Sequence, residues 1–113
     1  MAKSEKEIQK VLLAYAKAHP LIAWIDRANS GKVRVKGGFM QLHESGTPDL
    51  IGYSVSGKFV GIEIKDEKNF SLKGNGLRPD QVTRIADMKA NGCYVGVACT
   101  IEHVDLIMES LGG

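Results

Sequence analysis

One strand-like run, Val-Gly-Ile-Glu-Ile-Lys ending at Lys65, constrains the fold most, because it reads as an interior strand that also carries charges. Side chains alternate between the two faces of a strand, so Val60, Ile62 and Ile64 share one face. Glu63 and Lys65 share the other face. An unpaired charge in an interior strand costs several kcal/mol of desolvation free energy. We therefore expect these two side chains to have partners, and a divalent cation would offset the cost.

The remaining segments predict one α/β domain over residues 1–113. With 113 residues, of which 43% are apolar, the chain can form one compact core but not two ordinary domains. Apolar periodicity, turn residues and caps predict the order α-β-β-β-β-α-β-α. The expected elements are a helix at Ser4–His19, strands at Leu21–Arg27, Lys32–Lys36, Asp49–Val55 and Lys58–Lys65, a helix from Pro79 to Gly92, a strand at Cys93–Cys99 and a last helix after Thr100.

Several finer features are expected along this order. Residues 37–48 and 66–78 are rich in Gly and polar residues and predict irregular loops. In the helix that begins at Pro79, the residues expected to face inward are Val82, Ile85, Ala86 and Met88. The last helix is expected to close the structure against the sheet, and it carries the apolar residues Ile101, Val104, Leu106, Ile107 and Leu111.

Composition restricts the setting more than the partner. The formal charge of +2 is too small to indicate a nucleic-acid-binding protein by itself. Cys93 and Cys99 are about 20 Å apart on a straight strand, so they cannot form a disulfide with each other, and their apolar neighbours predict two buried thiols in a reducing compartment. The start of the sequence is charged and lacks the apolar stretch of a signal peptide or membrane span. We expect a cytoplasmic protein that does not insert into membranes.

Two acids and a lysine are expected to meet at one end of the central hairpin. Asp49 opens one strand, and Glu63 and Lys65 end the next. Mg²⁺ and Mn²⁺ prefer oxygen ligands, and Mg²⁺ is commonly held by one or two carboxylates together with waters and phosphate oxygens. A bound metal lowers the pKa of its water, and Lys65 would hold that water or stabilise developing negative charge. The alternative is a plain Glu63–Lys65 ion pair.

The connection between the two strands sets a condition on this site. With a two-residue turn, Val55 would oppose Lys58, and Asp49 would fall on the face of Ile64, away from Glu63. We therefore predict a three-residue loop or a bulge, which returns Asp49 to the Glu63 face.

These residues resemble the PD-(D/E)XK nuclease superfamily, and within it the small stand-alone VRR-NUC domain of bacteria and phages. The resemblance covers nearly the whole chain and rests on Pro48-Asp49, Glu63-Ile64-Lys65, an acid in the first helix (Glu7) and a glutamine that opens a later helix (Gln81). It implies a restriction-endonuclease-like core with a central mixed β-sheet flanked by helices.

The resemblance also implies roles for these residues. Asp49, Glu63 and the backbone carbonyl of Ile64 would bind Mg²⁺ or Mn²⁺, Lys65 would be the catalytic lysine, and Gln81 would position water or phosphate. Stand-alone members resemble homodimeric resolvases of four-way (Holliday) DNA junctions, in a bacterial or phage-infected cell. Junction specificity rests on the resemblance alone.

Two of the carried residues have competing explanations. Ser4-Glu5-Lys6-Glu7 forms a capping box pattern in which Glu7 bonds back to the helix start. Gln81 occupies a first-turn position where polar residues are frequent in any helix. Among the histidines, His43 lies in a loop and is left out of the site, and His19 and His103 are expected to be structural.

Basic residues supply candidate DNA contacts at two places. Both groups could bind phosphates, although solvated surface charge explains them equally well. Phe70 is alone in its segment, so no aromatic pattern predicts single-strand stacking, and a duplex or branched substrate is preferred. The predicted contacts are Lys32, Arg34 and Lys36 in one strand and Lys68, Lys73 and Arg78 in a later loop.

Three functions follow from these features. The first is a dimeric metal-dependent DNA endonuclease, selective for four-way junctions or acting generally on duplexes and flaps. The second is a nuclease-fold DNA-binding module without turnover. The third is an α/β domain that assists a larger complex.

Overall fold

A computed structural model describes residues 3–28, 32–35, 38–41 and 46–110, although for 32–35 and 38–41 only the backbone is described. No helix among these residues is long and apolar enough to cross a membrane. The elements are α1 (Glu5–Lys17), β1 (Ile22–Arg27), β2 (Lys32–Val35), β3 (Gly38–Gln41), β4 (Leu50–Ser54), β5 (Phe59–Ile64), α2 (Glu67–Phe70), the 3₁₀ helix η1 (Lys73–Gly76), α3 (Pro79–Ala90), β6 (Tyr94–Ala98) and α4 (Ile101–Glu109).

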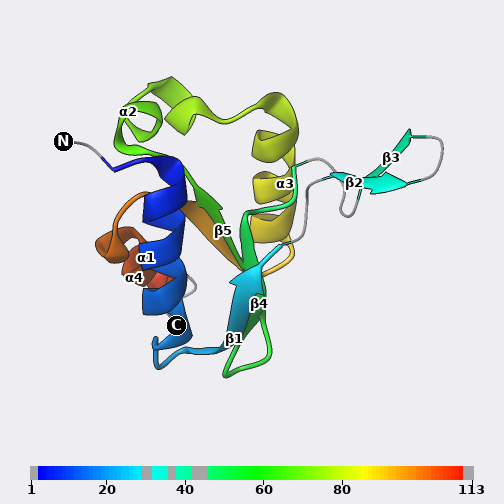
Figure 1. Ribbon diagram of the computed structural model, residues 1–113. Helices are drawn as coiled ribbons and strands as arrows, with labels where there is room; N and C mark the ends of the chain where they lie inside the picture. Colours follow the sequence, from blue (N-terminus) through cyan, green and yellow to red (C-terminus); the bar gives the residue numbers. More distant parts are fainter. Residues whose placement is uncertain (1–2, 29–31, 36–37, 42–45, 111–113) are drawn as a thin grey trace.

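The main sheet has four strands in the order β1-β4-β5-β6. The pairs β1/β4 and β4/β5 are antiparallel, and the pair β5/β6 is parallel. Helices α1 and α4 lie on one side of this sheet and α3 on the other (Figure 1). The predicted α/β class, with a mixed open sheet flanked by helices, is confirmed.

The core lies between the sheet and the α1/α4 layer. Val60, Ile62 and Ile64 of β5 are completely buried there, as their alternation predicts. They pack with residues of α1, β1, β4 and α4 such as Leu12, Ile25, Leu50, Val104 and Met108. The opposite face of β5 is thereby turned toward the α3 side, and this is the face that carries Glu63.

The β4–β5 hairpin has the predicted three-residue loop. The amide of Ser54 donates to the carbonyl of Lys58 at 2.8 Å, which leaves Val55, Ser56 and Gly57 as the loop. Gly57 has a φ of 84°, a left-handed conformation that glycine adopts without strain. Leu50 pairs with Ile62 in this register, so Asp49, one residue earlier, falls opposite Glu63.

Two predicted loops contain regular structure. Residues 37–48 were predicted to be irregular, which is wrong for Gly38–Gln41, because this segment forms β3 and pairs antiparallel with β2. Strand β1 belongs to the main sheet, whereas β2 and β3 form a separate two-stranded sheet. Residues 66–78 contain α2, which the side chain of Asp66 caps, and η1, whose backbone is kinked at Gly74 and Asn75.

The inward face of α3 also differs from the prediction. In α3, Val82 and Ala86 are exposed, and Gln81 and Ile85 are buried. In α4, Ile101 and Leu106 are exposed, whereas Val104, Ile107 and Met108 are buried, and Leu111 lies outside the described residues. Each helix sits at the edge of the sheet, so only a narrow stripe of its surface is covered.

The cysteines agree with the prediction in part. Cys93 and Cys99 are both free, so the excluded disulfide is indeed absent. Both side chains are only partly buried, and the prediction of fully buried thiols is wrong. Cys93 precedes β6 and Cys99 follows it, so each lies just beyond an end of the strand.

Candidate active site

Asp49 is held between two neighbouring strands. Its backbone carbonyl accepts a hydrogen bond of 2.8 Å from the amide of Ala28, at the end of β1. Its side-chain Oδ2 accepts a hydrogen bond of 2.8 Å from the amide of Ile64, at the end of β5. Backbone and side chain are thus both fixed, which presents the carboxylate at the end of the sheet.

Pro48 fits against the sheet because β5 carries glycine at position 61. A Cβ atom added to Gly61 would lie 2.9 Å from Cγ of Pro48, closer than real contacts allow. Pro48 is fully buried at this place. The strand therefore leaves room for the residue that delivers Asp49, and any larger residue at position 61 would push the Pro48-Asp49 segment away.

Glu63 is a buried acid without sufficient polar partners. Its side chain is 3% exposed, and its Oε2 atom has no hydrogen-bond partner among the described residues. Burial raises the pKa of Glu63 to about 9, helped by a hydrogen bond with Asp49 and by the negative charge of Asp49. The positive charges of Lys65 and Arg78 act in the opposite direction. Without a cation, this carboxyl is thus held protonated at neutral pH.

Lys65 lies one residue beyond β5, and its amide donates to the carbonyl of Ala98 at 3.1 Å. Its charge lowers the pKa of both Glu63 and Glu5, so the ammonium group lies near both carboxyls. The structure therefore brings Asp49, Glu63 and Lys65 together, as the sequence predicts.

The structure does not bring Glu7 to these residues. Glu7 is engaged in the capping box of α1, where its Oε1 accepts bonds from the amide and the hydroxyl of Ser4 at 3.2 and 3.0 Å. The hydrogen bond from the backbone of Ser4 is the main cause that lowers the pKa of Glu7. The contacts of Glu7 are therefore those of a helix cap, the competing explanation given above.

Glu5, from the same turn, faces the site instead. Although Glu5 is exposed overall, loss of solvent around its carboxyl raises its pKa, and the negative charge of Asp49 raises it further. Lys65 acts on the same carboxyl and lowers its pKa. The capping box was the signal that could have found Glu5, because a residue at the third helical position that bonds back to the cap cannot also reach the sheet.

Gln81 and Arg78 lie at the start of α3. Gln81 is 4% exposed, and its Oε1 accepts a hydrogen bond of 2.9 Å from the amide of Arg78. The side-chain oxygen of Gln81 therefore accepts a hydrogen bond within the first turn of α3. Arg78 is close enough for its charge to lower the pKa of Glu63, and its exposed guanidinium contacts Asp80 at 3.3 Å.

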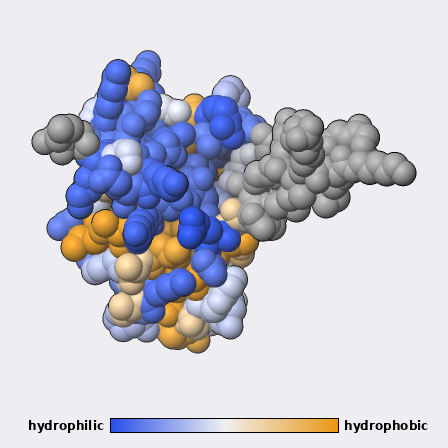
Figure 2. All heavy atoms as spheres, in the orientation of Figure 1, coloured by the Kyte–Doolittle hydropathy of each residue, from blue (hydrophilic) through white to orange (hydrophobic). Residues whose placement is uncertain are grey.

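The other predicted DNA contacts are spread over two places. Lys68 in α2 and Lys73 in η1 are exposed on the segment that follows β5. Figure 2 shows hydrophilic residues over the end of the molecule where α1 begins, next to this segment. Lys32 and Arg34 belong to β2, but their side chains, like Lys36 and His43, lie outside what the structure describes.

The acids fit a divalent cation of the kind that keeps most of its water. Among the described residues no group of three or more His, Cys, Asp or Glu is arranged to hold a metal. Two carboxylates suffice for Mg²⁺ when waters and phosphate oxygens complete the shell. The unpartnered Oε2 of Glu63, beside Asp49, is a position that such a cation would satisfy. The backbone amide of Ile64 donates a hydrogen bond to Asp49. That the carbonyl of Ile64 binds the metal stays a prediction.

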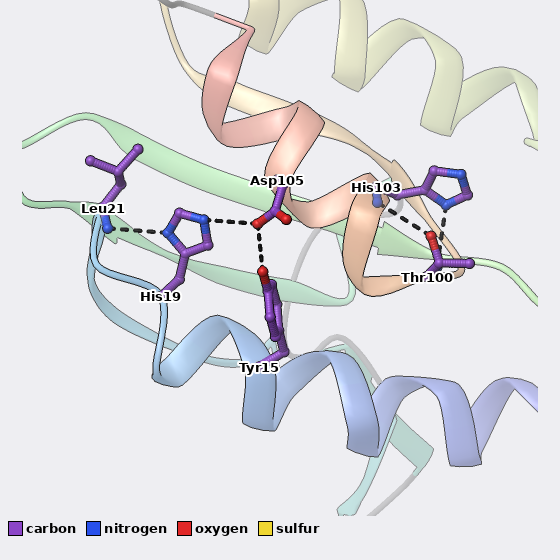
Figure 3. Close-up of polar contacts among 6 residues, drawn as sticks. All are labelled: Tyr15, His19, Leu21, Thr100, His103 and Asp105. Carbon is purple, nitrogen blue, oxygen red and sulfur yellow. Dashed lines mark hydrogen bonds and ion pairs between the residues drawn. The ribbon is translucent and has the colours of Figure 1, made fainter.

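His19 and His103 serve the fold (Figure 3). Nδ1 of His19 accepts from the amide of Leu21 at 3.1 Å, so Nε2 carries the proton and donates to Asp105 at 3.2 Å. Tyr15 donates to the same oxygen at 2.7 Å, which joins α1 to α4. Nδ1 of His103 accepts from two amides at the start of α4.

Comparison with known proteins finds no relative of this chain. No protein-family model matches the chain, and no curated protein sequence matches it.

Proposed function

We propose that this protein is a Mg²⁺- or Mn²⁺-dependent endonuclease that hydrolyses DNA phosphodiester bonds at Asp49, Glu63 and Lys65. The observation that carries the proposal is the buried, unpartnered Oε2 of Glu63, on a strand end directly beside the carboxylate of Asp49. A fold has no need of two adjacent carboxyls and a lysine at such a place, because burying a carboxylate is costly.

A restriction-endonuclease-like PD-(D/E)XK core is part of the proposal. Its support is the order of the sheet, in which an antiparallel β4–β5 pair carries the acids and β6 runs parallel to β5 after α3. The matching of Asp49 and Glu63 across that pair, with Lys65 just after it, agrees with the motif.

Each residue has a role in this reaction. Asp49 and Glu63 would hold the cation, with the carbonyl of Ile64 as a further ligand; when bound, the cation activates water and neutralises phosphate charge. Asp49 is oriented for this by the amide of Ile64. Lys65 donates to the attacking water or to the phosphate oxygen on which negative charge develops. Glu5, exposed at the rim, accepts a proton or a water hydrogen bond on the same side.

DNA is the proposed substrate, with a four-way junction as the preferred form and a homodimer as the acting unit. A C₂ dimer supplies two sites for two symmetric cuts. Arg78 is close enough for its charge to act on Glu63, and Lys68 and Lys73 are exposed on the segment that follows β5; all three side chains are suited to phosphate oxygens. A chain of this size has little surface for reading bases, which favours recognition of shape.

The test is cleavage of an end-labelled four-way junction and a matched linear duplex with Mg²⁺, Mn²⁺ or EDTA. Wild type is compared with Asp49→Ala and Lys65→Ala, and with Glu109→Ala, an exposed acid on α4, as the matched control. We expect paired, metal-dependent cuts in the junction that both site variants lose and the control keeps.

Other outcomes decide between the alternatives. Equal cutting of the duplex would indicate a general nuclease. Tight DNA binding with no cleavage under any metal would indicate a binding module without turnover. Undiminished cleavage by both site variants would contradict the proposed site.

A further inference from the structure

Three aromatic side chains form a row across three adjacent strands. Trp24 of β1 pairs with Tyr53 of β4, and Tyr53 pairs with Phe59 of β5. The rings of Trp24 and Tyr53 are stacked, with centroids 6.1 Å apart and planes inclined by 25°. Residues paired across strands point to the same face of a sheet, so the three rings share one face.

This aromatic row is open to solvent at one end. Phe59 is partly buried, beside Gly61 and the α3 side of the sheet. Trp24 and Tyr53 are 50% and 51% exposed. Helix α3 packs against β6, at the far side of the sheet from β1 (Figure 1). Two large stacked rings therefore keep about half of their surface in water.

The row lies on the same sheet face as the candidate active site. Along β4 the residues of this face are Asp49, Ile51 and Tyr53, because side chains alternate. Asp49 and Tyr53 are four residues apart, which is about 13 Å along a strand. That length is about four steps of a stacked nucleic-acid strand. A strand with its phosphate at Asp49 and Glu63 can therefore reach the rings.

The surroundings favour a base over a phosphate at this place. Asp26 pairs with Ile51, between the rings and the acids, and its negative charge repels phosphate. Bases are neutral and stack on aromatic faces whatever their identity. The polar tips of Trp and Tyr tolerate the partly wet surface that such a strand leaves.

From this arrangement we infer that Trp24 and Tyr53 bind an unpaired nucleobase of the DNA strand whose phosphate enters the Asp49–Glu63 site. The inference rests on the proposed function and narrows its substrate to DNA with unpaired bases near the cleaved bond, such as a flap or an opened junction. The sequence alone predicted no stacking, because Trp24 and Tyr53 lie far apart in the chain and meet only through the β1/β4 pairing.

Trp24 is the only tryptophan of the chain, so its fluorescence reports directly on this place. The first experiment titrates the protein in EDTA with a short oligothymidylate, with an abasic oligonucleotide of equal length and with a blunt duplex. We expect saturable quenching by the oligothymidylate and little change with the other two. Equal quenching by the abasic oligonucleotide, or none by any, would overturn the inference.

The second experiment measures the affinity for labelled oligothymidylate by anisotropy. Stacking contributions predict that Tyr53→Ala binds about five- to a hundredfold more weakly, and that Tyr53→Phe restores most of the loss. Leu106→Ala, which shortens another exposed apolar side chain, on α4, is the control and should bind like wild type. Because Tyr53 is half exposed, its loss should leave the fold intact, which circular dichroism checks.

Two further results separate this inference from its alternatives. If Trp24 fluorescence changes with protein concentration alone and Tyr53→Ala dissociates a dimer in sedimentation, the row is an interface between copies and the inference fails. Quenching without metal-dependent cleavage would support the stacking site and contradict the catalytic proposal. Metal-dependent cleavage without quenching would support the catalytic proposal and contradict the stacking site.

Discussion

The amide nitrogen of Ile64 donates a hydrogen bond of 2.8 Å to Oδ2 of Asp49, and this bond ties the two halves of the candidate site together. It orients one acid from the strand that carries the other. Because Asp49 falls opposite Glu63 in the hairpin register, the two carboxyls meet although neither has a salt bridge among the described residues. The following predictions depend on that closeness.

Glu63→Gln should make the metal-free protein more stable at pH 8 than wild type. The pKa of Glu63 is about 9 in the folded state and 4.5 as its ordinary value, so between these pH values the folded protein holds a proton that the unfolded chain has lost. Stability therefore falls as pH rises, by up to about 1.4 kcal/mol per unit. Glutamine does not titrate and removes this loss.

The measurement is urea unfolding in EDTA at pH 6 and pH 8. Wild type should lose roughly 2 to 3 kcal/mol more than Glu63→Gln between the two pH values. Parallel stability changes in both proteins would show that Glu63 is not the titrating group.

Binding of Mn²⁺ should release a proton. The cation needs the carboxylate form of Glu63, and burial keeps the acid protonated at neutral pH. Affinity should therefore rise about tenfold per pH unit from pH 6 to pH 8. Calorimetry at pH 7 in two buffers with different ionisation heats gives the number of protons. We expect nearly one for wild type and none for Glu63→Gln.

Glu5 and Glu7 should separate catalysis from stability. Glu5→Gln should slow cleavage by about tenfold or more with little change in stability, because its carboxyl faces Asp49 and Lys65. Glu7→Ala should lower the urea midpoint of unfolding, since it loses half of the capping box, and leave cleavage nearly unchanged. The measurements are the cleavage rate and the urea midpoint of each variant. Slow cleavage by Glu7→Ala, with normal cleavage by Glu5→Gln, would assign the catalytic role to Glu7.

The register of the β4–β5 hairpin should control metal binding. Deleting Ile51 from β4 shifts Asp49 by one residue relative to β5 and turns its side chain away from the face of Glu63. We expect loss of the Mn²⁺-induced rise in melting temperature. Deleting Ser56 is the control, because Ser54 and Lys58 stay paired around a two-residue turn and Asp49 stays opposite Glu63. An unchanged metal response after the Ile51 deletion would mean that the register does not place the acids.

The sequence by itself determined the local features of the protein. Alternation along residues 58–65 separated the buried Val60, Ile62 and Ile64 from Glu63, because the pleat of a strand has a period of two whatever surrounds it. The same parity required the three-residue loop at Val55–Gly57, which the hairpin has. Helix starts at Ser4, Pro79 and Thr100 also follow from short-range hydrogen bonding and proline geometry.

Tertiary structure decided what depends on long-range pairing. The burial of Gln81 follows from how α3 packs on the sheet, and no local pattern in the sequence contains that information. Trp24 and Tyr53 became a stacked pair through the β1/β4 register alone. The periodicity of a segment fixes which side chains share its faces, whereas only the assembled sheet decides what those faces meet.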